Sequence, residues 1–114
     1  MPPDDQVRLR HMLDAARTAA RYAHQHQRAD LDIDELAAHG LVRLIEIIGE
    51  AAARVSPGGR AALPDLPWPA IIGMRNRLVH GYYDVDLDVV WHTLTDDLPP
   101  LIEQLERHVP EASR

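Results

Sequence analysis

The chain has 114 residues, of which 46% are hydrophobic and 26% charged, and it contains no cysteine. This length suits one domain with a modest core, which we expect to span residues 1–114 with its core between about 7 and 109. The lack of cysteine excludes disulfide scaffolds, thiolate zinc sites and cysteine nucleophiles. No apolar run approaches the roughly 18 residues of a membrane span, and the start of the chain lacks a secretory signal pattern, so we expect a cytoplasmic protein.

The charged residues are unusual because all 12 basic residues are arginine. Arginine stays charged and offers a planar fork that fits phosphate or carboxylate. The net charge of −6 nevertheless argues against avid nucleic-acid binding over the whole surface. Any site for a polyanion must therefore be a local concentration of arginine.

Apolar residues recur at helical spacing along most of the chain, which predicts an all-α fold. The first helix is predicted over residues 5–27, and Asp32 or Asp34 can cap the helix that follows. This second helix contains the most apolar stretch, residues 41–55, and the Ser-Pro-Gly-Gly run at residues 56–59 ends it.

The third helix is predicted over residues 68–80, with Gly81 as its C-terminal cap. A fourth begins after Asp86, and the proline pair at residues 99–100 must kink or restart it. Four to five helices in up-and-down order make a small bundle. The second helix carries more apolar surface than one small core needs, and Gly49 would let backbones approach closely there. We therefore expect a homodimer with this helix at or near its interface.

The chemically informative residues gather at the end of the predicted third helix. A guanidinium, an amide, an imidazole and a phenol follow one another in Arg75, Asn76, His80 and Tyr82. On one continuous helix Asn76 and His80 share a face, and Tyr82 approaches Arg75 if the helical path persists through Gly81. Arginine can steady phosphate oxygens and histidine can move a proton near neutral pH, so the set suits a phosphodiester substrate. The alternative is that Arg75 and His80 merely complement the last carbonyls of a helix and its dipole.

With these residues the chain resembles the HepT-like toxins of the HEPN superfamily, which are all-helical and carry an R-x4-H-x-Y motif. Arg75, His80 and Tyr82 fill the motif. The resemblance extends from about Val7 to His108, and its other landmarks are residues 43–52, 67–74 and 97–101. A bare R-x4-H is common by chance, but the extended run over residues 67–91 is specific.

The resemblance implies a homodimer whose two motifs face one cleft and cleave RNA without a metal ion or any other cofactor. It also implies a companion antitoxin of the minimal nucleotidyltransferase type, which silences the toxin by adding AMP to the motif tyrosine, Tyr82. Two residues depart from the family pattern. Tyr83 stands where phenylalanine is more usual, and His92 stands where an acidic residue is expected.

The acidic residues of the second helix form another candidate. Glu46 and Glu50 share one face, and Glu50 is spaced to pair with Arg54. A carboxylate on this face could orient Arg75 or His80. The alternative is a salt-bridge ladder that is exposed to solvent or lies in an interface.

Two patterns that suggest metal binding fail on spacing. His24 and His26 are two apart on a helix and point to opposite sides. Residues 84–88 have the Asp-x-Asp-x-Asp opening of a calcium loop, but the sixth and twelfth positions lack the required glycine and glutamate. Capping of the fourth helix explains these aspartates better.

Three functions remain open at this point. In an endoribonuclease toxin, His80 would transfer a proton, Arg75 would bind the scissile phosphate and Asn76 would orient either of them. In a non-catalytic module, the same cleft would hold a nucleotide or RNA and the protein would act with its nucleotidyltransferase partner. A purely structural dimerisation domain would need none of these side chains. Growth arrest on expression, and activity of the purified protein on RNA, would separate the three.

Overall fold

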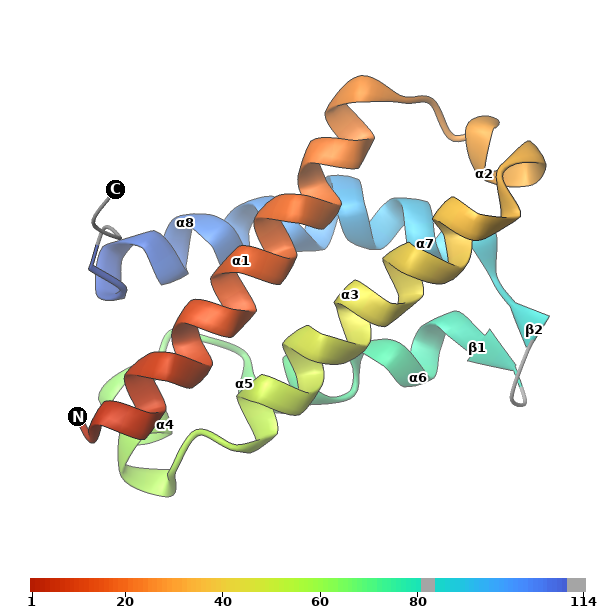
Figure 1. Cartoon of the computed structure of the whole chain (residues 1–114). Helices are drawn as coiled ribbons and strands as arrows, with labels where there is room; N and C mark the ends of the chain where they lie inside the picture. The colour runs from red at the N-terminus through yellow and green to blue at the C-terminus, as the bar shows by residue number, and fades with distance from the viewer. Residues whose placement is uncertain (81–83, 111–114) are drawn as a thin grey trace.

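The chain folds almost entirely into helices in this computed structural model, which describes residues 1–80 and 84–110 (Figure 1). The α-helices are α1 (Pro3–Gln25), α2 (Asp30–Ile33), α3 (Glu35–Ala53), α4 (Pro57–Ala62), α5 (Trp68–Ile72), α6 (Met74–Leu78), α7 (Leu87–His92) and α8 (Leu98–His108). A π-helix, η1 (Thr93–Asp97), joins α7 to α8, and a short antiparallel hairpin pairs β1 (Val79–His80) with β2 (Asp84–Val85). The predicted all-α class is confirmed, although the helices are shorter and more numerous than expected.

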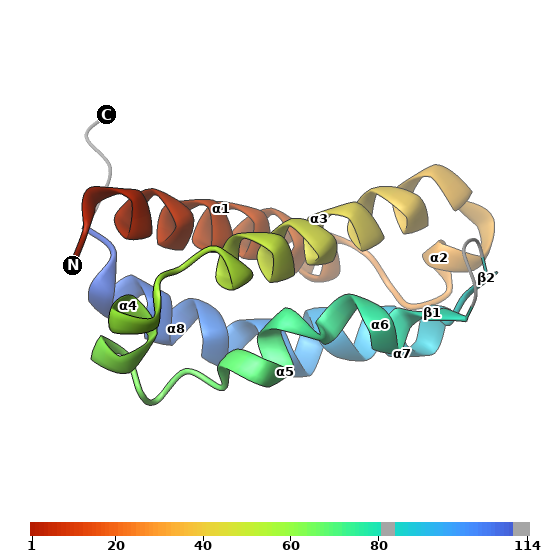
Figure 2. The same ribbon diagram turned by 90° about the horizontal axis from the view of Figure 1, so that it is seen from below.

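The helices form two layers (Figure 2). α1 and α3 lie side by side in one layer, whereas the α5–α6 segment and the α7–η1–α8 segment form the other. η1 and α8 pack against α1, and α5 and α6 pack against α3. The start of α1 and the end of α8 lie at one end of the molecule, and α2 and the hairpin lie at the other (Figure 1).

Aliphatic side chains fill the space between the layers. Leu9 and Met12 of α1 and Ile45 and Ile48 of α3 are almost completely buried, as their helical spacing predicts. Burial of each such side chain contributes roughly 1.5–3 kcal/mol to folding. Val7, at the start of the predicted core, is instead 47% exposed. Within the described residues, no helix is both long and apolar enough to cross a membrane.

Helix α3 begins at a capping residue that the sequence identifies. The side chain of Asp34 accepts a hydrogen bond from the backbone N–H of Ala37 at 3.0 Å. Asp32, the other predicted candidate, instead forms an ion pair with Arg28 at 3.1 Å. The cap satisfies one of the free N–H groups in the first turn of α3 and fixes where this helix starts.

A buried carboxylate ties the start of α1 to the segment after α3. Asp5 is 3% exposed and accepts hydrogen bonds from the backbone N–H and the hydroxyl of Ser56, at 2.9 and 2.6 Å. These two hydrogen bonds hold the pKa of Asp5 below its usual range, and the bond from the hydroxyl has the larger effect. The hydroxyl oxygen of Ser56 also caps α4 by accepting from Gly59 N–H at 3.0 Å. The run predicted to end the second helix therefore also starts a new one.

The predicted third helix is wrong in two respects. It is divided at Gly73 into α5 and α6, and it ends at Leu78, two residues early. The carbonyl of Leu78 accepts a hydrogen bond from Asp86 N–H at 2.7 Å, so the chain turns into the hairpin. Val79, which is β-branched, takes an extended conformation there (φ −124°, ψ 126°). The predicted cap, Gly81, lies outside the described residues.

The break predicted before the last helix is a π-helical segment. Asp86 caps α7, as expected, and the helix then widens in η1, where Leu98 N–H bonds to the carbonyl of Thr93, five residues earlier. Pro99 and Pro100 have no N–H and cannot continue the normal helical bonding to the residues four positions before them. The proline pair therefore shifts the hydrogen-bond register and lets α8 restart in the same direction.

Gly49 serves a contact within the chain. A Cβ atom at this position of α3 would lie 3.0 Å from the carbonyl oxygen of Ile72 and 3.3 Å from that of Ile71. The close backbone approach that we expected in a dimer interface is therefore made to α5 of the same chain. Homodimerisation itself remains a prediction.

Candidate active site

Helix α6 positions the first motif residue. Met74 and Leu78 are four apart and buried, which fixes the face that α6 turns toward the core. Arg75 follows Met74 and lies at the edge of α6 next to α3, with its side chain 40% exposed. Asn76 and Arg77 face solvent. One face of α6 thus presents polar side chains to solvent, while the opposite face packs into the core.

The hairpin, rather than a helix, positions His80. His80 stands opposite Asp84 in the β1–β2 pair and its side chain is 67% exposed. Asp86 follows directly after β2, and its Oδ2 atom lies 3.7 Å from Nε2 of His80. Oδ1 of the same side chain accepts from Val89 N–H at 3.2 Å and caps α7. One carboxylate therefore fixes the start of α7 and faces the motif imidazole. The sequence assigned it the first role and missed the second.

The prediction that the motif lies on one continuous helix is wrong. Because α6 ends at Leu78, Asn76 and His80 do not share a helical face. The same helix end removes the argument that Tyr82 returns to Arg75 after two helical turns. Tyr82 and the tyrosine after it lie outside the described residues, so the place of Tyr82 in the motif rests on the resemblance.

Arg75 is held by Glu46 of α3. Nε of Arg75 lies 3.4 Å from Oε2 of Glu46, and the two side chains are 40% and 31% exposed. This Nε atom is buried and makes no hydrogen bond within the described residues, so the charge pair is the interaction that balances its burial. This contact supports the hypothesis that a carboxylate of the predicted second helix orients Arg75.

Glu46 also joins Arg75 to a second guanidinium. Nη1 of Arg43 lies 2.7 Å from Oε1 of Glu46 and 3.2 Å from Oε1 of Glu50. The hydrogen bond to Glu46 is the main cause that raises the pKa of Arg43. Glu50 therefore pairs with Arg43 and not with Arg54, the partner that the spacing predicted. In chain order the network is Arg43, Glu46, Glu50 and Arg75 on two adjacent helices.

The two motif side chains are supported separately. Among the described residues no contact joins Arg75 to His80, since each is paired with a different carboxylate. The Nη atoms of Arg75 and Nδ1 of His80 likewise have no partner within the described part of the chain. The Nη edge of an arginine can bind two phosphate oxygens, and an imidazole can act as a proton-transfer group. This is the chemistry that phosphodiester cleavage requires.

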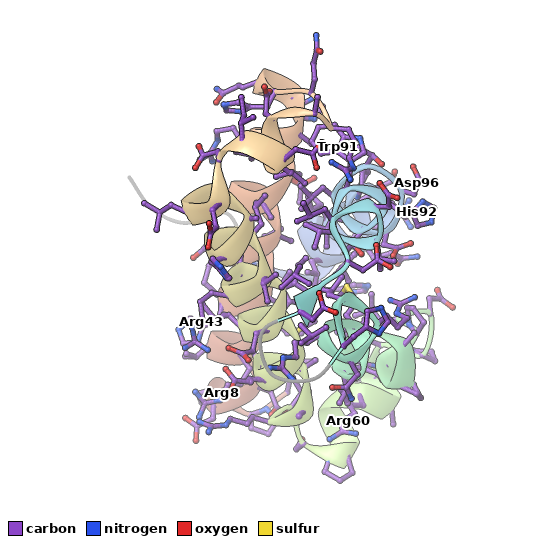
Figure 3. All side chains as sticks on the ribbon, turned by 90° about the vertical axis from the view of Figure 1, so that its right-hand side faces the viewer. Arg8, Arg43, Arg60, Trp91, His92 and Asp96 are labelled. Carbon is purple, nitrogen blue, oxygen red and sulfur yellow. The ribbon has the colours of Figure 1, made fainter. Side chains whose placement is uncertain are left out.

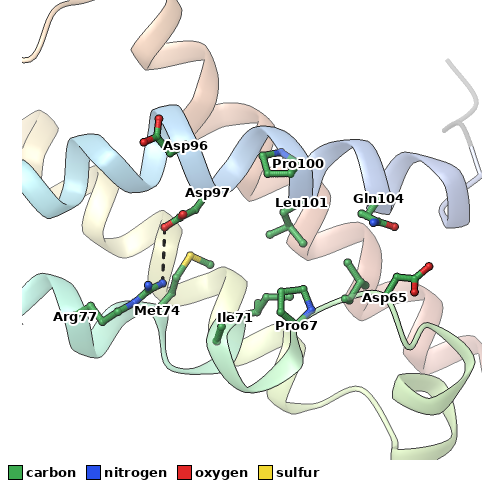
Figure 4. Close-up of a pocket in the computed structure, with 12 residues that line it drawn as sticks. Asp65, Pro67, Ile71, Met74, Arg77, Asp96, Asp97, Pro100, Leu101 and Gln104 are labelled. Atoms are coloured by element: carbon green, nitrogen blue, oxygen red, sulfur yellow. Dashed lines mark ion pairs between the residues drawn. The ribbon is translucent and has the colours of Figure 1, made fainter.

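An apolar hollow of about 320 Å³ lies apart from these residues, between α5–α6 and the η1–α8 segment (Figure 4). Ile71 and Leu101 belong to its lining, and Arg77 and Asp97 form an ion pair of 3.8 Å at one end. Neither Arg75 nor His80 lines it. It therefore adds nothing to the chemistry of the motif.

The remaining candidates have structural roles. Asp86 caps α7, and Asp88 forms an ion pair with Arg28 at 2.7 Å, which accounts for two of the three spaced aspartates. His92 pairs with Asp96 at 2.7 Å on the exposed side of α7 and η1 (Figure 3). Within the described residues no three His, Asp or Glu side chains are grouped to hold a metal ion.

Comparison with known proteins agrees with this chemistry. The family model described as "Ribonuclease HepT-like" matches residues 12–108. "Probable ribonuclease HepT" of Thermococcus cleftensis is 33% identical over 78 residues, which are 68% of this chain and 71% of that protein. "Putative RNase MJ1380" of Methanocaldococcus jannaschii is 30% identical in an 82-residue alignment that covers 68% of this chain and 75% of that protein. No solved structure matches. The chain belongs to the ribonuclease HepT-like family.

Proposed function

We propose that this protein is a metal-independent endoribonuclease and the toxin of a pair whose antitoxin is a minimal nucleotidyltransferase. Family membership supports ribonuclease chemistry. The residue assignment rests on one arrangement: Glu46 lies 3.4 Å from Nε of Arg75, and Asp86 lies 3.7 Å from Nε2 of His80. The outer nitrogen atoms of both side chains have no partner among the described residues.

The proposed reaction is attack of a ribose 2′-hydroxyl on its own 3′ phosphate. A bond forms from the 2′ oxygen to phosphorus, the bond to the 5′ oxygen of the next nucleotide breaks, and the products are a 2′,3′-cyclic phosphate and a free 5′-hydroxyl. His80 donates the proton that the leaving 5′ oxygen needs, and Arg75 stabilises the charge on the phosphate oxygens. Asn76 is exposed on the same turn as Arg75 and can orient the substrate.

The second proton in this reaction points to a dimer. The 2′-hydroxyl loses a proton as it attacks, and a second imidazole across a shared cleft can accept it. A homodimer with two facing motifs supplies that group, as the family resemblance implies. The RNA substrate and the nucleotidyltransferase partner belong to the cytoplasm, where we place the protein.

Regulation is proposed to act on the same site. By the family resemblance, addition of AMP to Tyr82 adds an anion to the motif, where it would compete with the phosphate of RNA for the guanidinium of Arg75. Such competition needs no change of fold.

The deciding experiment is cleavage of RNA by the purified protein, expressed without the nucleotidyltransferase, beside the His80→Ala variant. We expect cyclic phosphate ends from the wild type and at least 100-fold slower cleavage by the variant. A folded wild-type protein that binds RNA and never cleaves it would overturn the endoribonuclease proposal and favour the non-catalytic module. Equal cleavage by both proteins would overturn the assignment of His80.

A further inference from the structure

A basic hollow of about 380 Å³ lies between α1 and α3, outside the proposed active site. Arg8 and His11 of α1 and Arg43 of α3 line it, together with Arg54 at the C-terminal cap of α3. Figure 3 shows Arg8 and Arg43 on the same side of the molecule. The two long helices and the residue that caps α3 thus bring three guanidinium groups and an imidazole around one concave surface.

This concentration of positive charge is unusual in a chain with a net charge of −6. Glu50 is the single acidic residue of the lining, and it is bound to Arg43 at 3.2 Å. Arg8 and Arg54 form no ion pair with any described residue, although Arg54 has the spacing to reach Glu50. Within the described part of the chain, the hollow therefore keeps two guanidinium groups without an ion-pair partner, which favours an anionic ligand.

Several other arginines on the surface are paired with carboxylates. Arg28 lies between Asp32 and Asp88, and Arg107 pairs with Glu103 at 2.8 Å. The positive charge of the hollow is thus a local feature and does not extend over the whole protein. This agrees with the expectation from the net charge that any site for a polyanion is a local concentration of arginine.

The hollow adjoins the motif through Glu46. Oε1 of Glu46 lies 2.7 Å from Arg43 at the edge of the hollow, and Oε2 lies 3.4 Å from Arg75. One carboxylate therefore separates the guanidinium of the hollow from the guanidinium of the motif. An anionic chain that reaches Arg75 with one phosphate can place neighbouring phosphates at Arg43 and beyond.

We infer that the hollow lined by Arg8, His11, Arg43 and Arg54 binds the phosphodiester backbone of an RNA strand whose scissile phosphate lies at Arg75. The inference rests on the proposed function and extends it to the substrate. Planar guanidinium groups bind phosphate oxygens in pairs and carry no base preference, so the hollow sets the affinity and path of the strand and not its sequence.

The test uses the full-length protein and a labelled 12-nucleotide RNA with 2′-O-methyl groups, which block the attacking hydroxyl. Its dissociation constant is measured by fluorescence anisotropy between 50 and 200 mM salt. The test variant is Arg8→Gln/Arg54→Gln. The matched control, Arg21→Gln/Arg107→Gln, removes the same charge from exposed positions outside the hollow.

The test variant should bind at least about 10-fold more weakly than the control, and its plot of log affinity against log salt should be shallower by about 1.4, as loss of two phosphate contacts predicts. Equal constants and slopes in the two double variants would overturn the inference, as would a wild type that does not bind this RNA. The inference would also be overturned if the test variant bound RNA normally but no longer bound the nucleotidyltransferase, or if light scattering showed a changed oligomeric state. Either result would identify the hollow as a protein interface. If circular dichroism shows that the double variant does not fold, Arg54→Gln alone is compared with Arg107→Gln. Half of the change in the salt-dependence slope is then expected.

Failure of this inference is distinguishable from failure of the proposed function. Cleavage of unmodified RNA by the wild type tests the function, whereas the difference between the two double variants tests the hollow. Normal cleavage with no difference between the variants would leave the endoribonuclease proposal in place and remove the hollow from it.

Discussion

The carboxylate of Glu46 lies 3.4 Å from Nε of Arg75 and joins α3 to α6 at the proposed active site. Because the contact uses Nε, the two Nη atoms have no partner among the described residues and present an edge that suits phosphate. We therefore propose that Glu46 is a positioning residue that acts on the substrate through Arg75.

The Glu46→Gln variant tests this role. It keeps the shape of the side chain and removes the charge that faces Arg75, so we expect kcat to fall by about 10-fold or more, since misplacement of a catalytic group by 1 Å can cost about 100-fold. Glu46→Asp should recover part of the loss. Glu103→Gln, which breaks an exposed ion pair with Arg107, is the matched control and should leave kcat unchanged. A fall in thermal stability with unchanged kcat would show that Glu46 serves structure alone.

The motif residues themselves should be dispensable for folding. Arg75→Ala and His80→Ala remove side chains that are 40% and 67% exposed, so both variants should keep the melting temperature of the wild type within a few degrees. Both should abolish growth arrest, and loss of the proton-transfer group should slow cleavage on the order of 10²–10⁴-fold. Cleavage by the wild type should persist in EDTA. A strict need for an added divalent ion would contradict the mechanism, and full toxicity of a well-expressed His80→Ala protein would exclude His80 from it.

Asp86 has two roles that two substitutions can separate. Its Oδ1 caps α7 and its Oδ2 faces His80. Asp86→Ala removes both, and loss of the cap should lower the free energy of unfolding by about 0.5–2 kcal/mol. Asp86→Asn keeps a good capping group and should be close to the wild type in urea denaturation. Both variants should cleave RNA more slowly than the wild type. Normal cleavage by a destabilised Asp86→Ala protein would reduce Asp86 to a cap.

Two glycines of α3 form a matched pair for the packing of this helix. A Cβ at Gly49 would press on backbone oxygens of α5 that cannot move freely, so Gly49→Ala should destabilise the fold by roughly 1–3 kcal/mol. A Cβ at Gly40 would meet nothing within 4 Å, and Gly40→Ala should stabilise the helix by about 0.5–1 kcal/mol. Urea denaturation measures both. A neutral Gly49→Ala would show that α3 and α5 can separate without cost.

The sequence predicts the long helices well because local signals and burial agree in them. In α3 the cap at Asp34 and the apolar spacing through Ile45 and Ile48 indicate the same element. The end of α6 could not be predicted in this way. Its last carbonyl, on Leu78, bonds to Asp86, eight residues later, and such a tertiary bond leaves no periodic pattern in the sequence.

The candidate site was predictable in its residue types but not in its supporting contacts. Arg75 and His80 are found from their chemistry and the motif, yet the spacing assigned them to a single helix. Helical spacing suggested that Glu50 pairs with Arg54, whereas Glu50 reaches Arg43, seven residues earlier. Side-chain rotamers decide between partners on the same helical face, and the sequence does not specify them.

The last prediction concerns which tyrosine receives AMP. The motif resemblance assigns Tyr82, and the neighbouring Tyr83 offers a second phenol. Tyr22 can be set aside on structural grounds. Its hydroxyl oxygen is buried without a hydrogen-bond partner among the described residues, and its ring stacks on His26 with centroids 3.9 Å apart. Burial is also the main cause that raises the pKa of Tyr22, so its phenolate is harder to form than that of an exposed tyrosine.

Mass spectrometry of the protein co-expressed with its nucleotidyltransferase should therefore place the adenylyl group on Tyr82. Tyr82→Phe should remain toxic in the presence of an active partner, because the proposed anion can no longer form near Arg75. Tyr83→Phe and Tyr22→Phe are the matched controls, and both should still be neutralised by modification. Adducts confined to Tyr83, or normal neutralisation of Tyr82→Phe by an active partner, would refute the assignment. Modification of Tyr22 in the folded protein would further require its buried hydroxyl to become exposed, which hydrogen exchange across α1 would detect as lost protection.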